Sequence, residues 1–195
     1  FIDYIKMDYD LAIQNSNKII KKYPSYKNID YVYYIKAISY YEQIKNEKLD
    51  GRYNELALEN FKKIIKLFPN SKYATDSEQK IIAINENIAA KHMDIGLYYQ
   101  NSNNYFSAIS RYNTVINEYS SSKFTPEALH RLVEIYLTLG MYDDAKKTAA
   151  VLSYNFPKSI WYEKTYELVG EKKTKNDSFF LKIYKFLKVN NDKKE

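Results

Sequence analysis

Residues 125–159 read TPEALHRLVEIYLTLGMYDDAKKTAAVLSYNFPKS, the clearest structural unit in the sequence. Its opening Thr-Pro-Glu predicts the start of a helix, because a hydroxyl can cap it, proline suits its first turn and an acid suits its positive end. Gly140 predicts the end of that helix, since glycine readily takes the left-handed C-cap conformation. A second helix then passes through Ala145 and ends before Pro157. The stretch is therefore predicted to be a hairpin of two helices.

The spacing of the second helix recurs along the chain. Four times an alanine is followed, twelve residues later, by a proline or serine that has an aromatic residue just before it. The pairs are Ala12 with Pro24, Ala57 with Pro69, Ala108 with Ser120 and Ala145 with Pro157. An apolar residue seven positions after each alanine keeps one helix face apolar, and the small alanine lets a neighbouring helix approach closely. Serines at the following turns are expected as turn or N-cap residues: Ser25, Ser71, Ser122 and Ser159.

These hairpins resemble the tetratricopeptide (TPR) family. We expect an all-α fold in which TPR helical-hairpin repeats form a right-handed superhelical solenoid. The repeat domain is expected over residues 1–170, with a partial repeat at 1–26, repeats at about 28–71, 73–122 and 125–159, and a cap helix from about 160. Residues 46–52 read as an insert, and the absence of proline between 73 and 100 predicts an extra helix that leads into the third repeat. Residues 171–195 are expected to form a basic linker and an amphipathic C-terminal helix.

The composition of the chain excludes several classes of function. The chain has 195 residues, 45% of them hydrophobic, and no cysteine, which excludes disulfides and thiolate metal sites. Residues 171–195 hold eight lysines and four acids, so +4 of the net charge of +6 lies there. The remainder is nearly balanced, which argues against a nucleic-acid partner. Because HExxH, GxSxG and a glycine-rich phosphate loop are all missing from the sequence, we expect neither an enzyme nor a cofactor or metal site.

Three segments carry a more specific resemblance. Residues 28–37 read NIDYVYYIKA, residues 68–76 read FPNSKYATD, and residues 98–111 contain Tyr-Tyr followed by Ala-Ile-Ser-Arg. They are similar to the N-I-D-Y-V-x-Y-x-[RK]-G stretch, the Y-P-N-S-x-Y-x-x-D turn and the corresponding helix of the BamD (ComL/YfiO) family of outer-membrane assembly lipoproteins. The likeness covers about residues 1–160 and departs after about residue 165.

The resemblance implies a non-catalytic scaffold subunit of the outer-membrane β-barrel protein assembly (BAM) complex. Such a subunit works at the periplasmic face of the outer membrane of a Gram-negative bacterium. Its C-terminal repeats would dock a POTRA domain of BamA, with other BAM subunits alongside, and its N-terminal repeats would recognise unfolded outer-membrane proteins. The resemblance also implies that the natural protein extends N-terminally beyond Phe1 and carries a lipid anchor at its N-terminus.

The same resemblance implies where the partner binds. Arg111 falls at the family position of an arginine that pairs with an acid on BamA, and a guanidinium can hold a carboxylate through two parallel hydrogen bonds. Further partner-binding residues are expected beside it: Asn104, Tyr105, Ser107 and Glu118.

Two alternatives stay open. Another periplasmic TPR adaptor, for cell-envelope or division machinery, would explain the repeats but not residues 28–37. The role of the tail, residues 171–195, is the second open point. Five of its apolar residues share one helix face with lysines between them: Phe179, Phe180, Ile183, Tyr184 and Leu187. Such a segment could cap the last repeat or lie on an anionic membrane surface.

Overall fold

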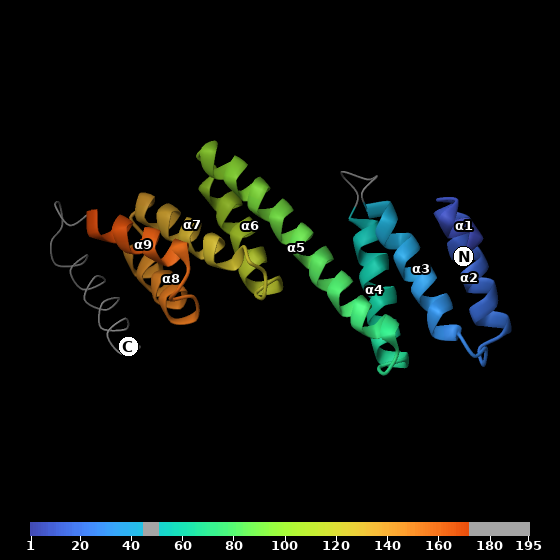
Figure 1. Ribbon diagram of the computed structural model, residues 1–195. Coiled ribbons are helices and arrows are strands. Elements are labelled where there is room, and N and C mark those ends of the chain that lie inside the picture. Colours follow the sequence, from blue (N-terminus) through green and yellow to red (C-terminus); the bar gives the residue numbers. More distant parts are fainter. Residues whose placement is uncertain (45–50, 172–195) are drawn as a thin grey trace. The chain divides into compact units, whose positions relative to one another are not determined.

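The computed structural model describes residues 1–44 and 51–171, with side chains described to residue 169, and every regular element within these ranges is an α-helix (Figure 1). The helices are α1 (Ile2–Ile5), α2 (Tyr9–Lys22), α3 (Ile29–Gln43), α4 (Arg52–Leu67), α5 (Lys72–Asn101), α6 (Tyr105–Glu118), α7 (Thr125–Thr138), α8 (Tyr142–Asn155) and α9 (Ile160–Glu171). They form two compact units, one of residues 1–85 and one that begins at Glu86.

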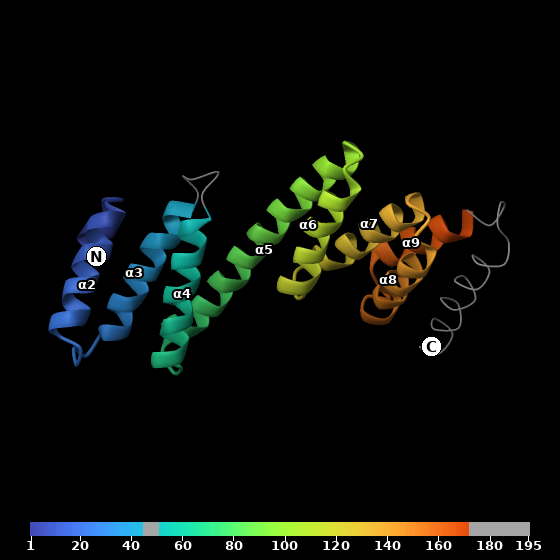
Figure 2. The same ribbon diagram turned by 180° about the vertical axis from the view of Figure 1, so that it is seen from behind.

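The four alanines of the repeat lie on α2, α4, α6 and α8. Ala12, Ala57, Ala108 and Ala145 are at most 2% exposed, so their lack of a long side chain permits close helix packing. In the first unit α3 packs against both α2 and α4, and in the second α7 packs against both α6 and α8 (Figures 1 and 2). The prediction of an all-α fold built from TPR-type hairpins is confirmed.

The turns that follow α2, α4, α6 and α8 share one backbone conformation. Their aromatic C-cap residues, Tyr23, Phe68, Tyr119 and Phe156, have φ of −133°, −135°, −124° and −131°. Each aromatic carbonyl accepts a hydrogen bond from the N–H three residues later, at 2.8–3.1 Å. The hydroxyls of Ser71, Ser122 and Ser159 then accept the N–H two residues further on at 3.2 Å. The predicted role of these serines at the turns is confirmed, and Ser25 lies in the equivalent turn.

One capping prediction is wrong. Thr125 is the first residue of α7, and Phe124 stands at its N-cap. The Thr125 hydroxyl donates instead to the carbonyl of Tyr119 at 3.1 Å. Because Ser122 already serves the turn, the threonine is free to tie α7 back to the end of α6.

Two of these serines also hold neighbouring repeats together. Ser71 donates to Asp30 Oδ2 at 2.6 Å in the first unit, and Ser122 donates to Glu86 Oε2 at 2.9 Å in the second. Glu86 Oε1 also accepts the N–H of Lys123 at 2.9 Å. The same acid–serine pair therefore joins consecutive hairpins in both units, and we call it the serine latch.

The turns inside the hairpins are of a second kind. Met7, Asn103 and Gly140 have φ of 61°, 58° and 73°, and each follows the first helix of a hairpin. The next residue donates its N–H to the carbonyl five positions back at 2.8–2.9 Å, which is the Schellman pattern. The predicted C-cap at Gly140 is confirmed, and two non-glycine residues take the same strained conformation.

Replacing Gly140 by alanine is expected to lower the free energy of unfolding by about 1 kcal/mol, because a Cβ disfavours the left-handed region. Nothing lies within 4 Å of the Cβ position, so the loss would be conformational rather than steric. Urea unfolding followed by circular dichroism measures it. Gly51→Ala is the matched control, because Gly51 has equal space but a φ of −71°. An unchanged midpoint for Gly140→Ala would contradict the expectation.

Helix α5 is unbroken from Lys72 to Asn101, which confirms the prediction of an extra helix continuous with the third repeat. Residues 46–50 of the predicted insert and the predicted tail helix lie outside the described residues. Repeat boundaries and superhelical hand stay predictions. Among residues 1–44 and 51–171, helices long and apolar enough to cross a membrane are absent.

Candidate partner-binding surface

The predicted partner-binding residues lie together along α6. Asn104 is its N-cap, and the Asn104 side-chain oxygen accepts the N–H of Ser107 at 3.4 Å. The hydroxyl of Tyr105 donates to Asn103 Oδ1 at 2.9 Å, which fixes the ring beside the turn. Asn104 is exposed, while Tyr105 and Ser107 are half-buried. The start of α6 is thus held by local bonds with its outer side open to solvent.

Arg111 and Glu118 lie two turns apart on α6 and both act on His92 of α5. Burial lowers the pKa of His92, the positive charge of Arg111 lowers it further, and Glu118 opposes the shift. The imidazole stacks on Tyr119 at 6.1 Å between ring centroids. Its Nδ1 is buried and has no hydrogen-bond partner among the described residues. The structure therefore brings Arg111 and Glu118 together with a neutral histidine that sequence reasoning did not assign to this site.

A comparison of the repeats shows why Arg111 stands out. It follows the repeat alanine by three positions, where the other helices have Asn15, Asn60 and Thr148. Asn15 bonds Asp3 and Asn60 bonds the carbonyl of Leu56, so these amides serve their own repeats. Arg111 is the one charged residue at this position, and this difference between the repeats is already visible in the sequence.

A polar network in the second unit was also missed. Glu134 of α7 accepts from Arg131 Nη1 at 3.0 Å and from Gln100 Nε2 at 3.2 Å, and its other oxygen lies 3.4 Å from His130 Nε2. Tyr112, whose ring is fully buried, donates its hydroxyl to Gln100 Oε1 at 2.8 Å. Burial alone would raise the pKa of Glu134, but the bonds from His130 and Arg131 outweigh it and hold that pKa at about 2.

The network continues onto α9. His130 Nδ1 lies 2.7 Å from the hydroxyl of Thr165, which donates to the carbonyl of Trp161 at 2.8 Å. The Trp161 ring is flanked by the Arg131 guanidinium at 5.2 Å and by Lys164 Nζ at 4.3 Å. These contacts tie α9 to α7. They serve packing, because the Arg131 guanidinium is already paired with Glu127 and Glu134.

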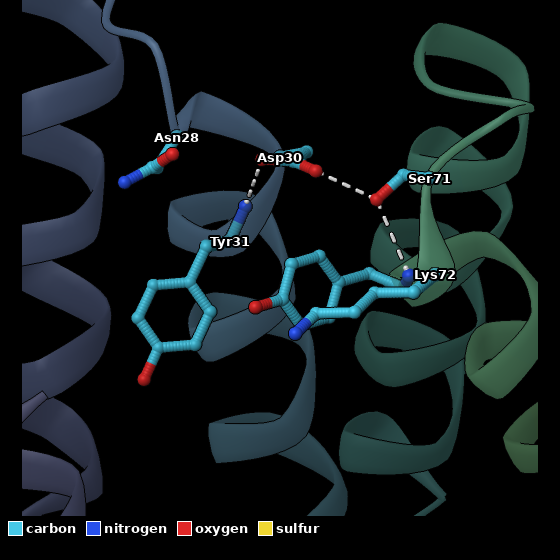
Figure 3. A pocket seen from close by; sticks show the side chains of 6 residues that line it. Asn28, Asp30, Tyr31, Ser71 and Lys72 are labelled. Atoms are coloured by element: carbon cyan, nitrogen blue, oxygen red, sulfur yellow. Dashed lines mark hydrogen bonds between the residues drawn. The ribbon is translucent and has the colours of Figure 1, made fainter.

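The first unit contains a pocket of about 470 Å³ between the start of α3 and the start of α5 (Figure 3). It is lined by Asn28, Asp30, Tyr31, Ser71, Lys72 and Tyr73. Figure 3 shows Asp30 and Ser71 pointing toward one another, with Asp30 also accepting the N–H of Tyr31 at 2.8 Å. The Asp30 carboxylate is therefore already engaged in the serine latch.

Within the described part of the chain, groups of three or more His, Cys, Asp or Glu side chains able to hold a metal are absent. What α6 offers instead is recognition. It presents a guanidinium, a carboxylate and several hydroxyl and amide groups on an ordered helix, which suits a protein partner better than a reacting small molecule.

Comparison with known proteins identifies the family. The profile of the YfiO family, described as "Outer membrane lipoprotein", matches residues 2–152. The chain belongs to this family. The YfiO match covers nearly all of the first unit and the second unit as far as residue 152, and it includes α6 with Arg111.

The three relatives compared below are each named "Outer membrane protein assembly factor BamD". The chain is 39% identical to that of Caulobacter vibrioides over 88% of its own length and 56% of the relative. It is 41% identical to that of Rickettsia prowazekii over 85% of its own length and 66% of the relative. The protein from Xylella fastidiosa (strain Temecula1) is 28% identical, over 83% and 58%. The chain thus spans between about half and two thirds of the length of these relatives.

The C-terminal part of a TPR repeat-containing protein from Cytophaga hutchinsonii is similar with a TM-score of 0.37 and 17% identity. The alignment covers 99% of this chain and 78% of that one, but a TM-score this low does not bear on the fold.

Proposed function

We propose that this chain is a non-catalytic scaffold of outer membrane protein assembly and that α6 binds a POTRA domain of BamA. The observation that carries the proposal is Arg111, a half-buried cation held beside His92 at a position that is neutral in the other repeats. The names of the relatives, all outer membrane protein assembly factors, support the same process. The periplasmic face of the outer membrane is the proposed location.

The chemistry of the contact follows from the guanidinium. Arg111 can donate two parallel hydrogen bonds to one carboxylate, which fixes the orientation of the partner as well as contributing to affinity. His92 beside it is kept neutral, since burial and Arg111 both lower its pKa. The partner is therefore expected to present an Asp or Glu toward Arg111 on α6.

Binding to purified POTRA domains of BamA from the same organism tests the proposal. Arg111→Glu is expected to weaken binding at least tenfold, because it places two carboxylates against each other. Arg111→Lys keeps the charge but loses the two-point geometry, so we expect an intermediate loss. Lys158→Glu, an exposed charge reversal in the turn before α9, is the matched control and should bind as the parent does.

The outcomes separate the readings. Binding that survives Arg111→Glu would move the site away from α6. Absence of binding by the folded parent chain would favour the second candidate, another periplasmic TPR adaptor for cell-envelope or division machinery. Recognition of unfolded outer-membrane proteins, contacts with other BAM subunits and membrane attachment through a lipid anchor or the basic tail stay predictions.

A further inference from the structure

We infer that Phe106, on the uncharged outer face of α6, is the apolar anchor of the same docking surface, and that the partner offers an apolar pocket for it beside the acid that meets Arg111. This inference rests on the function proposed above and deepens it. It starts from Phe106, whose side chain is 79% exposed, the largest exposed fraction of any large hydrophobic residue in the described ranges.

The outer face of α6 differs from the same face of the other three repeat helices. On α6 the face consists of Phe106, Ser110, Thr114 and Asn117, which stand two positions before and two, six and nine positions after the repeat alanine. None of the four is charged. At the equivalent positions α2 has three charged residues, α4 has four and α8 has two. In a chain with 28% charged residues, α6 alone has lost them all from this face.

The absence of a charged residue at the first position of this face lowers the stability of α6. In α2, α4 and α8 this position is an acid, namely Asp10, Glu55 and Asp143. An acid in the first turn of a helix is stabilised by the positive helix end, typically by 0.3 to 1 kcal/mol. Phe106 gives up this stabilisation and leaves an aromatic ring in water, and no packing within the chain compensates for an exposure of 79%. A partner that covers the ring would supply this compensation.

The position of Arg111 joins this face to the proposed site. With about 100° of rotation per residue, Ser107 and Glu118 lie between Thr114 and Arg111 around the helix. Phe106 and Arg111 are about 7.5 Å apart along the axis and about 140° apart around it, at the two ends of one continuous arc. An aromatic residue and an arginine, separated here by mostly uncharged polar residues, are residue types enriched at the energetic centre of protein interfaces. Ser107, which was expected from sequence, lies within this arc.

The experiment measures the affinity of Phe106→Ala and Phe106→Asp for the same POTRA domains. Both variants are expected to bind at least about tenfold more weakly than the parent. Phe106→Asp restores the acid of the other helices, so its unfolding midpoint should equal or exceed that of the parent, which separates binding from folding. Ile82→Ala, at an exposed position of 61% on α5, is the control and should bind normally.

The outcomes distinguish this inference from the proposed function. If Arg111→Glu loses binding while both Phe106 variants keep it, the aromatic anchor is overturned and the proposed function stands. If the Phe106 variants lose binding while Arg111→Glu keeps it, the anchor stands and the charged contact fails. If neither substitution alters binding, or the parent does not bind, both are overturned.

Discussion

Replacing Gly96 by leucine is expected to destabilise the protein by about 3 kcal/mol, since it overfills a packed helix contact. A Cβ at Gly96 would lie 2.6 Å from Cε1 of Tyr112 and 3.0 Å from two further ring atoms. The ring cannot move away easily, because it is fully buried and its hydroxyl is bonded to Gln100. Even Gly96→Ala should lose stability, although alanine is by about 1 kcal/mol the better helix former.

Urea unfolding followed by circular dichroism measures the effect, with Gly51→Leu as the control because Gly51 has no atom within 4 Å of its Cβ position. The double variant Gly96→Ala/Tyr112→Leu should recover part of the stability that Gly96→Ala loses, since leucine is smaller than tyrosine and leaves room for the added Cβ. A Gly96→Leu protein as stable as the parent would show that α5 and α6 do not pack as described.

Replacing Glu134 by glutamine is expected to cost about 2 to 3 kcal/mol, because Arg131 and His130 would then face a neutral partner in a partly buried site. The cost stays below that of a fully buried ion pair, since the Glu134 side chain is 28% exposed. Thermal or urea unfolding at pH 7 provides the measurement. Glu163→Gln on the exposed side of α9 is the matched control and should have little effect.

The pH dependence of Glu134 gives a second readout. The folded protein lowers the pKa of Glu134 from 4.5 to about 2. Its stabilising contribution is therefore complete above about pH 4.5 and is lost as the pH falls toward about 2. The difference in unfolding free energy between the parent and Glu134→Gln should shrink over this window. A difference that stays constant from pH 5 to pH 2 would contradict the paired carboxylate.

The parts of the fold that depend on local sequence were predictable. Ala12, Ala57, Ala108 and Ala145 are buried as their spacing required, and the missing prolines before Gln100 predicted the continuous α5. Local reasoning was wrong at Thr125, because two hydroxyls compete to serve one turn and Ser122 takes that role. The left-handed conformation of Met7 could not be predicted, since methionine rarely adopts it. Asn103 gave only a weak sign, because asparagine takes this conformation less often than glycine.

Part of the candidate site was also predictable from the sequence. Arg111 was expected from the family resemblance. Aligning the four repeats on their alanines is enough to show that Arg111 and Phe106 differ from the residues at the same positions in the other repeats. The group around Glu134 could not be predicted as a whole, because it joins residues from three helices. The one local sign was the spacing of His130 and Glu134, one helical turn apart.

The serine latch defines the natural boundary for exchanging parts of this chain. Each latch needs an acid on one hairpin and a serine at the start of the next, as in Asp30 with Ser71 and Glu86 with Ser122. A cut placed just after a latch serine therefore yields a segment that brings its own acid and ends with its own serine. Copying the chain from one latch serine to the next would preserve every serine latch. This holds for gene duplication and for a design that lengthens the protein by one hairpin. A cut at the Asn103 turn, inside a hairpin, would instead leave Glu86 on one side and Ser122 on the other.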